Sequence, residues 1–73
     1  MKHTVDYVKT GKNLKQILSD KNISINELAE KMECSPRTIQ NWINAKTKIS
    51  TKSLIVLMWA LETESSDIIV TTE

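Results

Sequence analysis

The chain is almost free of the two residues that most often form tight turns. Its 73 residues include one glycine, Gly11, and one proline, Pro36. Sheets joined by hairpins need more of both residues at their turns, whereas helices can be joined by short polar segments. We therefore expect an all-α fold, and a chain of this length forms one small domain.

Strong start signals define two short helices in the middle of the chain. Ser24 and Glu27 have the spacing of a capping box, which predicts a helix over residues 25–32. The dipeptide Ser35-Pro36 predicts a second helix over about 36–44, because serine caps a helix and proline at the first helical position loses no hydrogen bond.

Weaker caps and apolar spacing predict the other helices, for a total of four to five. Thr10 is the expected N-cap of a first helix that opens at Gly11 and ends near Asn22, where asparagine tolerates a left-handed C-cap. The last two helices are expected from a cap at Ser50 or Thr51 to Leu61, and from a cap at Ser65 or Ser66 to Ile69. Apolar residues at helical spacing mark the expected core: Leu14, Ile17 and Leu18; Leu28, Ala29 and Met32; Ile39, Trp42 and Ile43; Leu54, Leu57, Met58 and Leu61.

These elements divide the chain into a leader over 1–10, a folded domain over 11–70 and a tail over 71–73. The β-prone end, 68–72, can pair as a strand either with the leader or with a second copy of the chain.

Several functional classes find no support in the composition. No stretch of about 18 apolar residues is present to span a membrane, and the start has no apolar signal sequence, so we expect a cytoplasmic protein. The single cysteine, Cys34, excludes an intramolecular disulfide and is expected to be a buried structural thiol. His3, the one histidine, has no catalytic partners, and there is no glycine-rich phosphate loop. We expect no enzyme activity, no cofactor and no metal.

The helices over 25–32 and 36–44 are joined by about three residues, which is the spacing of a helix-turn-helix. In this setting the sequence resembles the Cro/repressor-like (XRE) helix-turn-helix family over Leu14 to about Ile69. The resemblance implies a lambda-repressor-like DNA-binding domain of a small bacterial or phage regulator. The stretches that carry it are Thr10–Leu14, Ser24–Met32, Ser35–Trp42, Asn44–Lys48, Leu54–Leu61 and Asp67–Val70.

The sequence departs from the family pattern at three positions. The family often has a glutamine that meets a phosphate where this chain has Ile25, and a glutamate and a glycine where it has Ile43 and Ala45. A Cβ disfavours the left-handed conformation that ends such a helix. Asn44 is therefore an alternative to Ala45 for that position.

The outward face of the helix over 36–44 carries the expected DNA-reading residues. The resemblance places base contacts on Pro36, Arg37 and Asn41. Proline makes no polar base contact, whereas arginine pairs with guanine and asparagine or glutamine with adenine. We therefore expect Arg37 and Asn41 to read bases directly, with Gln40 and Thr38 as secondary base-reading residues.

The loop after this helix carries the expected phosphate contacts. In the family this loop follows the phosphate backbone, and lysine is a suitable point charge for phosphate. Helix capping alone also explains Ser35, so capping and phosphate contact are two alternatives for this residue. The expected phosphate-contacting residues are Ser35, Asn44, Lys46, Lys48 and Lys52.

The formal net charge of +1 conceals an uneven distribution. Residues 1–21 carry +3, residues 22–33 carry −2, residues 34–53 carry +4 and residues 54–73 carry −4. The segment expected to meet DNA is therefore the most basic, and the acidic end should face away from it.

These observations predict a sequence-specific transcriptional regulator, a repressor, that binds double-stranded DNA as a homodimer, at least on DNA. The alternative is a protein-interaction module, such as an antitoxin-like or anti-repressor partner. Val56 and Trp59 on a second face of the helix over 54–61 motivate that alternative, and Trp59 is either a core residue or part of a dimer surface.

Overall fold

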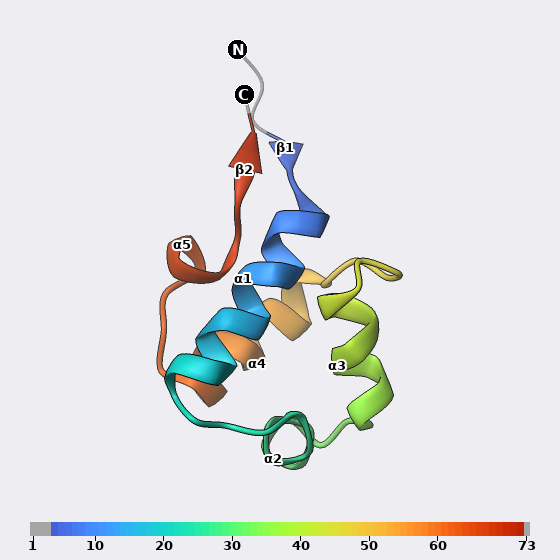
Figure 1. The fold of residues 1–73 in the computed structure, drawn as a ribbon, viewed down its shortest axis with the longest axis vertical. Helices are drawn as coiled ribbons and strands as arrows, with labels where there is room; N and C mark the ends of the chain where they lie inside the picture. Colours follow the sequence, from blue (N-terminus) through green and yellow to red (C-terminus); the bar gives the residue numbers. More distant parts are fainter. Residues whose placement is uncertain (1–3, 73) are drawn as a thin grey trace.

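The computed structural model describes residues 4–72 and contains five short helices and one pair of two-residue strands. This confirms the all-α expectation of four to five short helices. The elements in chain order are β1 (Thr4–Val5), α1 (Tyr7–Asp20), α2 (Ile25–Met32), α3 (Pro36–Ile43), α4 (Thr51–Leu61), α5 (Ser65–Ile68) and β2 (Thr71–Thr72) (Figure 1).

One core holds the five helices together. Each helix contributes at least one fully buried side chain, and each such side chain stabilises the fold by about 1.5–3 kcal/mol. The aliphatic side chains with 0% exposure are Leu14, Leu28, Ile39, Leu57 and Ile68. The predicted apolar faces of α1 to α4 all lie in this core or pack against its edge. Over residues 4–72, no helix combines the length and the apolar character needed to cross a membrane.

The caps of α2 and α3 agree with the sequence. Ser24 Oγ accepts from Glu27 N at 3.0 Å, and Glu27 Oε1 accepts from Ser24 N at 3.2 Å, which completes the capping box. Pro36 opens α3 behind the N-cap Ser35. The starts of α2 and α3 are therefore set by local signals.

The start of α1 differs from the prediction. Asp6, not Thr10, is its N-cap, and the Asp6 carboxylate accepts from Lys9 N at 3.0 Å. Thr10 lies inside the helix and is 1% exposed. Its hydroxyl accepts from Val70 N at 2.9 Å, so the side chain that we expected to cap α1 instead ties this helix to the C-terminal segment.

Gly11 also serves a different purpose from the expected helix opening. It is buried within α1, where this helix crosses the end of α3. A Cβ at this position would lie 2.6 Å from the carbonyl oxygen of Trp42 and closer still to that of Ile43. Glycine therefore allows the two helix backbones to approach each other.

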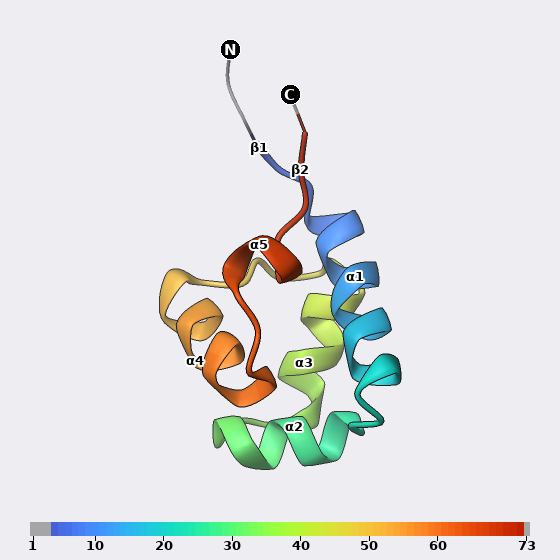
Figure 2. The same ribbon diagram turned by 90° about the vertical axis from the view of Figure 1, so that its left-hand side faces the viewer.

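The C-terminal segment pairs with the leader of the same chain. β1 and β2 are antiparallel, with Val5 opposite Thr71, and Asp6 N donates to the carbonyl of Val70 at 2.8 Å. Asn13 Nδ2 donates to the carbonyl of Ile68 at 3.0 Å, which fixes α5 against α1. Figures 1 and 2 show β1 and β2 side by side at one end of the molecule.

The end of α3 decides between the two alternatives for the left-handed position. Ala45 adopts the left-handed conformation with φ 58°, while Asn44 has φ −88°. Ala45 therefore holds the left-handed position, and the alternative that placed Asn44 there is wrong. Asn22 does adopt the left-handed conformation at the end of α1, as predicted, with φ 56°.

Candidate nucleic-acid interface

Two faces of α3 have opposite characters. Ile39 and Trp42 are buried and hold the helix against the core, which also packs α3 against α1 and α2. On the outer side, Arg37 and Gln40 are exposed, and Asn41 is half-buried beside them. Packing against the core thus leaves α3 with an outer polar stripe, which is formed by three of the predicted base-reading residues.

Ser35 and Thr38 are joined by hydrogen bonds at the start of α3. Ser35 Oγ accepts from Thr38 N at 3.3 Å, and the two hydroxyl oxygens lie 3.0 Å apart. Both hydroxyls therefore help to fix the first turn of the helix. This geometry establishes the capping role of Ser35.

The loop after α3 is organised by the helix itself. The carbonyl of Asn41 accepts from Lys46 N at 2.8 Å, so the turn is joined to the polar stripe of α3. Lys46 and Lys48 are exposed, and Lys48 Nζ lies 5.6 Å from the centre of the Tyr7 ring. A cation–π contact at an exposed site contributes about 0.5–1 kcal/mol, which is small enough for a phosphate to replace it.

Lys52 lies at the second position of α4, directly after this loop, and Asn44 is the exposed C-cap of α3. Ser50 caps α4, because its Oγ accepts from Ser53 N at 3.1 Å. Among residues 4–72, Arg37, Lys46 and Lys52 form no ion pair with a carboxylate. Their charges are therefore free to attract an anion.

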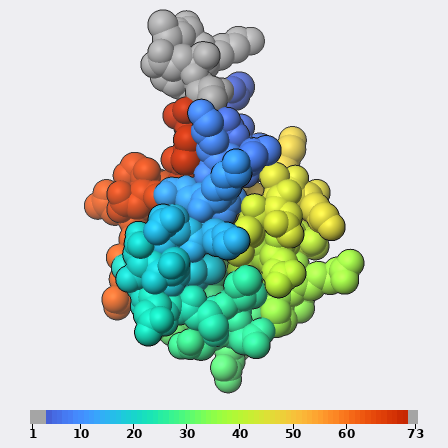
Figure 3. Space-filling view, in the orientation of Figure 1, coloured from blue at the N-terminus to red at the C-terminus, as the bar shows by residue number. Residues whose placement is uncertain are grey.

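Two further lysines lie beside α3, and the sequence did not single them out. Lys15 of α1 lines a hollow together with Gln40 and Asn44, and this hollow also touches Ile25, where the family often has a glutamine. Lys12 lines an adjoining hollow with Asn44. Figure 3 shows α1, in blue, running alongside the end of α3 and its loop. The charge of +3 over residues 1–21 was the available signal, but only the fold shows where it points.

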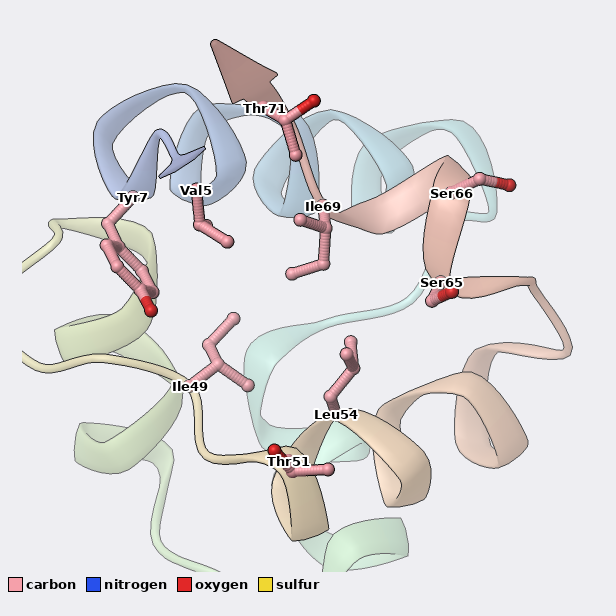
Figure 4. A pocket seen from close by; sticks show the side chains of 9 residues that line it. All are labelled: Val5, Tyr7, Ile49, Thr51, Leu54, Ser65, Ser66, Ile69 and Thr71. Atoms are coloured by element: carbon pink, nitrogen blue, oxygen red, sulfur yellow. The ribbon is translucent and has the colours of Figure 1, made fainter. Parts of the chain in front are cut away.

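Another hollow in the described part of the chain has a different lining from the two beside α3. It has a volume of about 570 Å³ and lies among α4, α5, the start of α1 and the loop before α4 (Figure 4). Its lining is aliphatic and hydroxylic, and Tyr7 is its only ionisable side chain. The residues that line it are Val5, Tyr7, Ile49, Thr51, Leu54, Ser65, Ser66, Ile69 and Thr71.

Cys34 lies half-buried in the turn between α2 and α3 and packs against the core. Burial raises the pKa of its thiol above the ordinary value. Between residues 4 and 72, no three histidine, cysteine, aspartate or glutamate side chains gather in a group that could hold a metal ion.

The sequence and the fold of this chain are similar to those of known proteins. The family model of the Cro/C1-type HTH DNA-binding domain matches residues 13–73. No curated protein sequence matches the chain.

Solved structures share the fold at low sequence identity. The clp gene regulator ClgR from C. glutamicum is 24% identical with a TM-score of 0.79, over 85% of this chain and 80% of that one. The restriction-modification controller protein C.AhdI from Aeromonas hydrophila is 22% identical with a TM-score of 0.82, over 86% and 96%. A transcriptional regulator from Listeria innocua is 18% identical with a TM-score of 0.74, over 100% and 64%.

The family match spans most of α1 and all of α2 to α5, and therefore includes the whole polar stripe of α3 and the basic loop. The spacing of α2 and α3, their caps and the shared fold agree with it. The chain belongs to the Cro/C1-type helix-turn-helix DNA-binding domain family.

Proposed function

We propose that the protein is a sequence-specific transcriptional regulator that inserts α3 into the major groove of DNA. The observation that carries this proposal is the outer stripe of α3. Arg37, Gln40 and Asn41 project from a helix whose other face is buried, and Arg37 has no competing ion pair within residues 4–72. Arginine, glutamine and asparagine are the side chains that recognise base edges in this groove.

Lysines on both sides of α3 support the proposal. Lys46, Lys48 and Lys52 follow the helix, and the fold adds Lys12 and Lys15 from α1. Contacts of this kind position a protein on the phosphate backbone without specifying sequence. Exposed Asn44 completes the set, and Lys15 supplies a charge beside Ile25, where the family's phosphate-binding glutamine is missing.

Ser35 and Thr38 have a smaller part in this proposal. Their hydroxyls bond to each other, so each must keep that bond or exchange it when DNA arrives. We assign both residues to holding the start of α3, with contact to DNA as a second role. Arg37 and Asn41 remain the proposed direct readers of bases.

The proposed regulator acts as a repressor in the cytoplasm and has no catalytic activity. Occupation of a site is enough to exclude other proteins from the same DNA. A homodimer matches two-fold related half-sites about 34 Å apart. The nearest rival is a protein-interaction module, which the exposed Trp59 on α4 favours.

Selection of bound sequences from random double-stranded DNA tests this proposal. The expected result is enrichment of one motif with two-fold symmetry. The affinity for mixed DNA should also fall steeply with salt, since each phosphate contact contributes about −0.9 to the slope of log K against log salt. Absence of binding to any DNA at low salt would overturn the proposal and leave the interaction module as the better reading.

A further inference from the structure

The helix α4 is apolar on every side, although only one side faces the core. Residues Leu54–Leu61 are eight successive apolar residues. Leu57, Ala60 and Leu61 are buried, whereas Ile55 and Trp59 on the opposite side are 61% and 72% exposed. A helix that is hydrophobic all round is normally covered all round. The outer side of α4 therefore has the character of an interface.

The exposed apolar residues are concentrated on this helix. Within residues 4–72, three large hydrophobic side chains are exposed, and two of them, Ile55 and Trp59, lie one turn apart on α4. The third, Val8, lies on α1. Single exposed apolar side chains are ordinary, but adjacent ones that include a tryptophan mark interaction surfaces.

The charges at the two ends of this face indicate which partner docks on it. Lys52 precedes Ile55 by three residues, and Glu62 follows Trp59 by three residues. The pattern is thus symmetric about the middle of the helix, with opposite charges at its ends. If a second α4 lies antiparallel across it, Ile55 meets Trp59 of the other copy, and Lys52 meets its Glu62. A partner of one charge would be attracted at one end and repelled at the other.

The position of α4 agrees with this pairing. Figures 1 and 2 place α4 to one side of α3, and α1 lies on the other side in Figure 2. A second copy docked on the outer face of α4 therefore leaves the exposed stripe of α3 uncovered. With two-fold symmetry, each copy contributes one α3 for one of two paired half-sites.

We infer that the outer face of α4, formed by Ile55 and Trp59 between Lys52 and Glu62, is the surface through which two copies of this chain pair in an antiparallel manner. This inference rests on the proposed function, in which two copies occupy two half-sites. It assigns Trp59 to the dimer surface and not to the core.

Sedimentation equilibrium of the full chain without DNA, over a range of protein concentrations, measures the pairing. Trp59→Ala should raise the dimer dissociation constant about 30-fold, as expected for a central tryptophan of an interface. Val8→Ala is the matched control, because it removes the third exposed apolar side chain and should leave the dissociation constant unchanged. Circular dichroism should show native helix content in both variants.

A charge exchange tests the antiparallel register. At low salt, Lys52→Glu and Glu62→Lys should each weaken the dimer severalfold, because each places like charges opposite one another. The double variant should return to within about twofold of the original dissociation constant. Since Lys52 is also a proposed phosphate contact, the readout is dimerisation in the absence of DNA.

The possible outcomes separate this inference from the proposed function. A chain that stays monomeric at all concentrations, or a Trp59→Ala variant that pairs like the original, overturns the α4 interface even if DNA binding is intact. A dimer that responds to these variants but binds no DNA supports the interface and removes the proposed function. Pairing only with a different protein overturns the inference and favours the interaction module.

Discussion

Replacing Gly11 with alanine tests how closely α1 and α3 approach each other. In an ordinary helix interior this change stabilises a protein by about 0.8–1 kcal/mol, because alanine is the better helix former. Here the new Cβ would lie 2.6 Å from the carbonyl oxygen of Trp42 and closer to that of Ile43. Both opposing groups are backbone, so no side-chain rotation can make room. The end of α3 must move instead.

The two effects oppose each other, and the steric one is larger. Overpacking a well-packed site costs about 1–3 kcal/mol, and contacts to backbone place Gly11→Ala at the upper end of that range. Subtracting the gain in helix propensity leaves a net loss of about 2 kcal/mol in the free energy of unfolding. For a domain of this size, such a loss lowers Tm by about 8–16 °C.

Urea unfolding followed by circular dichroism measures this loss. Ser19→Ala is the matched control, because Ser19 is exposed on the same helix. That control should gain a few tenths of a kcal/mol from helix propensity alone. A Gly11→Ala variant as stable as the original, or more stable, would refute the argument that glycine is required for the contact between α1 and α3.

Three further predictions concern other parts of the molecule. Ala45→Gly should raise the free energy of unfolding by about 0.5–1 kcal/mol in urea titrations, because glycine adopts φ 58° without the steric cost that alanine carries; an unchanged or lower value would contradict this. Lys15→Ala should reduce the salt slope of DNA binding by about 0.9, whereas Lys9→Ala on the same helix should leave it unchanged, and equal slopes would argue against a phosphate contact of Lys15. Since burial raises the pKa of Cys34, less thiolate is present at pH 8 in the folded than in the unfolded chain, and iodoacetamide should react more slowly with the native protein. The difference should shrink as the pH rises above the folded pKa, and identical rates at pH 8 would count against burial of the thiol.

Sequence signals predicted the elements whose cause is local. The capping box of Ser24 and Glu27 and the dipeptide Ser35-Pro36 each concern neighbouring backbone groups, and the structure shows both caps in place. Asn22 likewise ends α1 with a conformation that asparagine tolerates. These residues lie in the helix-turn-helix or just before it, which explains why the central part of the fold could be predicted.

Sequence reasoning failed where distant contacts decide the outcome. We expected Thr10 to be the N-cap of α1, but Asp6 holds that position. The structure buries Thr10 against Val70, which lies 60 residues away in the chain. Ala45 is the less favourable residue for a left-handed conformation, but the turn after α3 imposes it. Propensity alone does not reveal either constraint.

In the candidate site, too, some residues could be placed from local sequence signals and others only from the packing of the fold. Arg37, Gln40 and Asn41 share one side of α3 because helical spacing places them there. Lys12 and Lys15 join them through the packing of α1 against α3, which no local pattern predicts. Lys48 is drawn towards Tyr7 by a ring contact that the sequence did not indicate.

The central claim is that α3 reads bases while the surrounding lysines bind phosphate. Asn41→Ala tests it most directly, because asparagine carries no charge and its loss leaves the electrostatic attraction intact. Fluorescence anisotropy should show an affinity loss of about 1–3 kcal/mol on the selected DNA sequence and none on random DNA, whereas Lys46→Ala should weaken both equally. Equal losses for Asn41→Ala on the two DNAs, or no loss on either, would contradict the claim that this helix reads sequence.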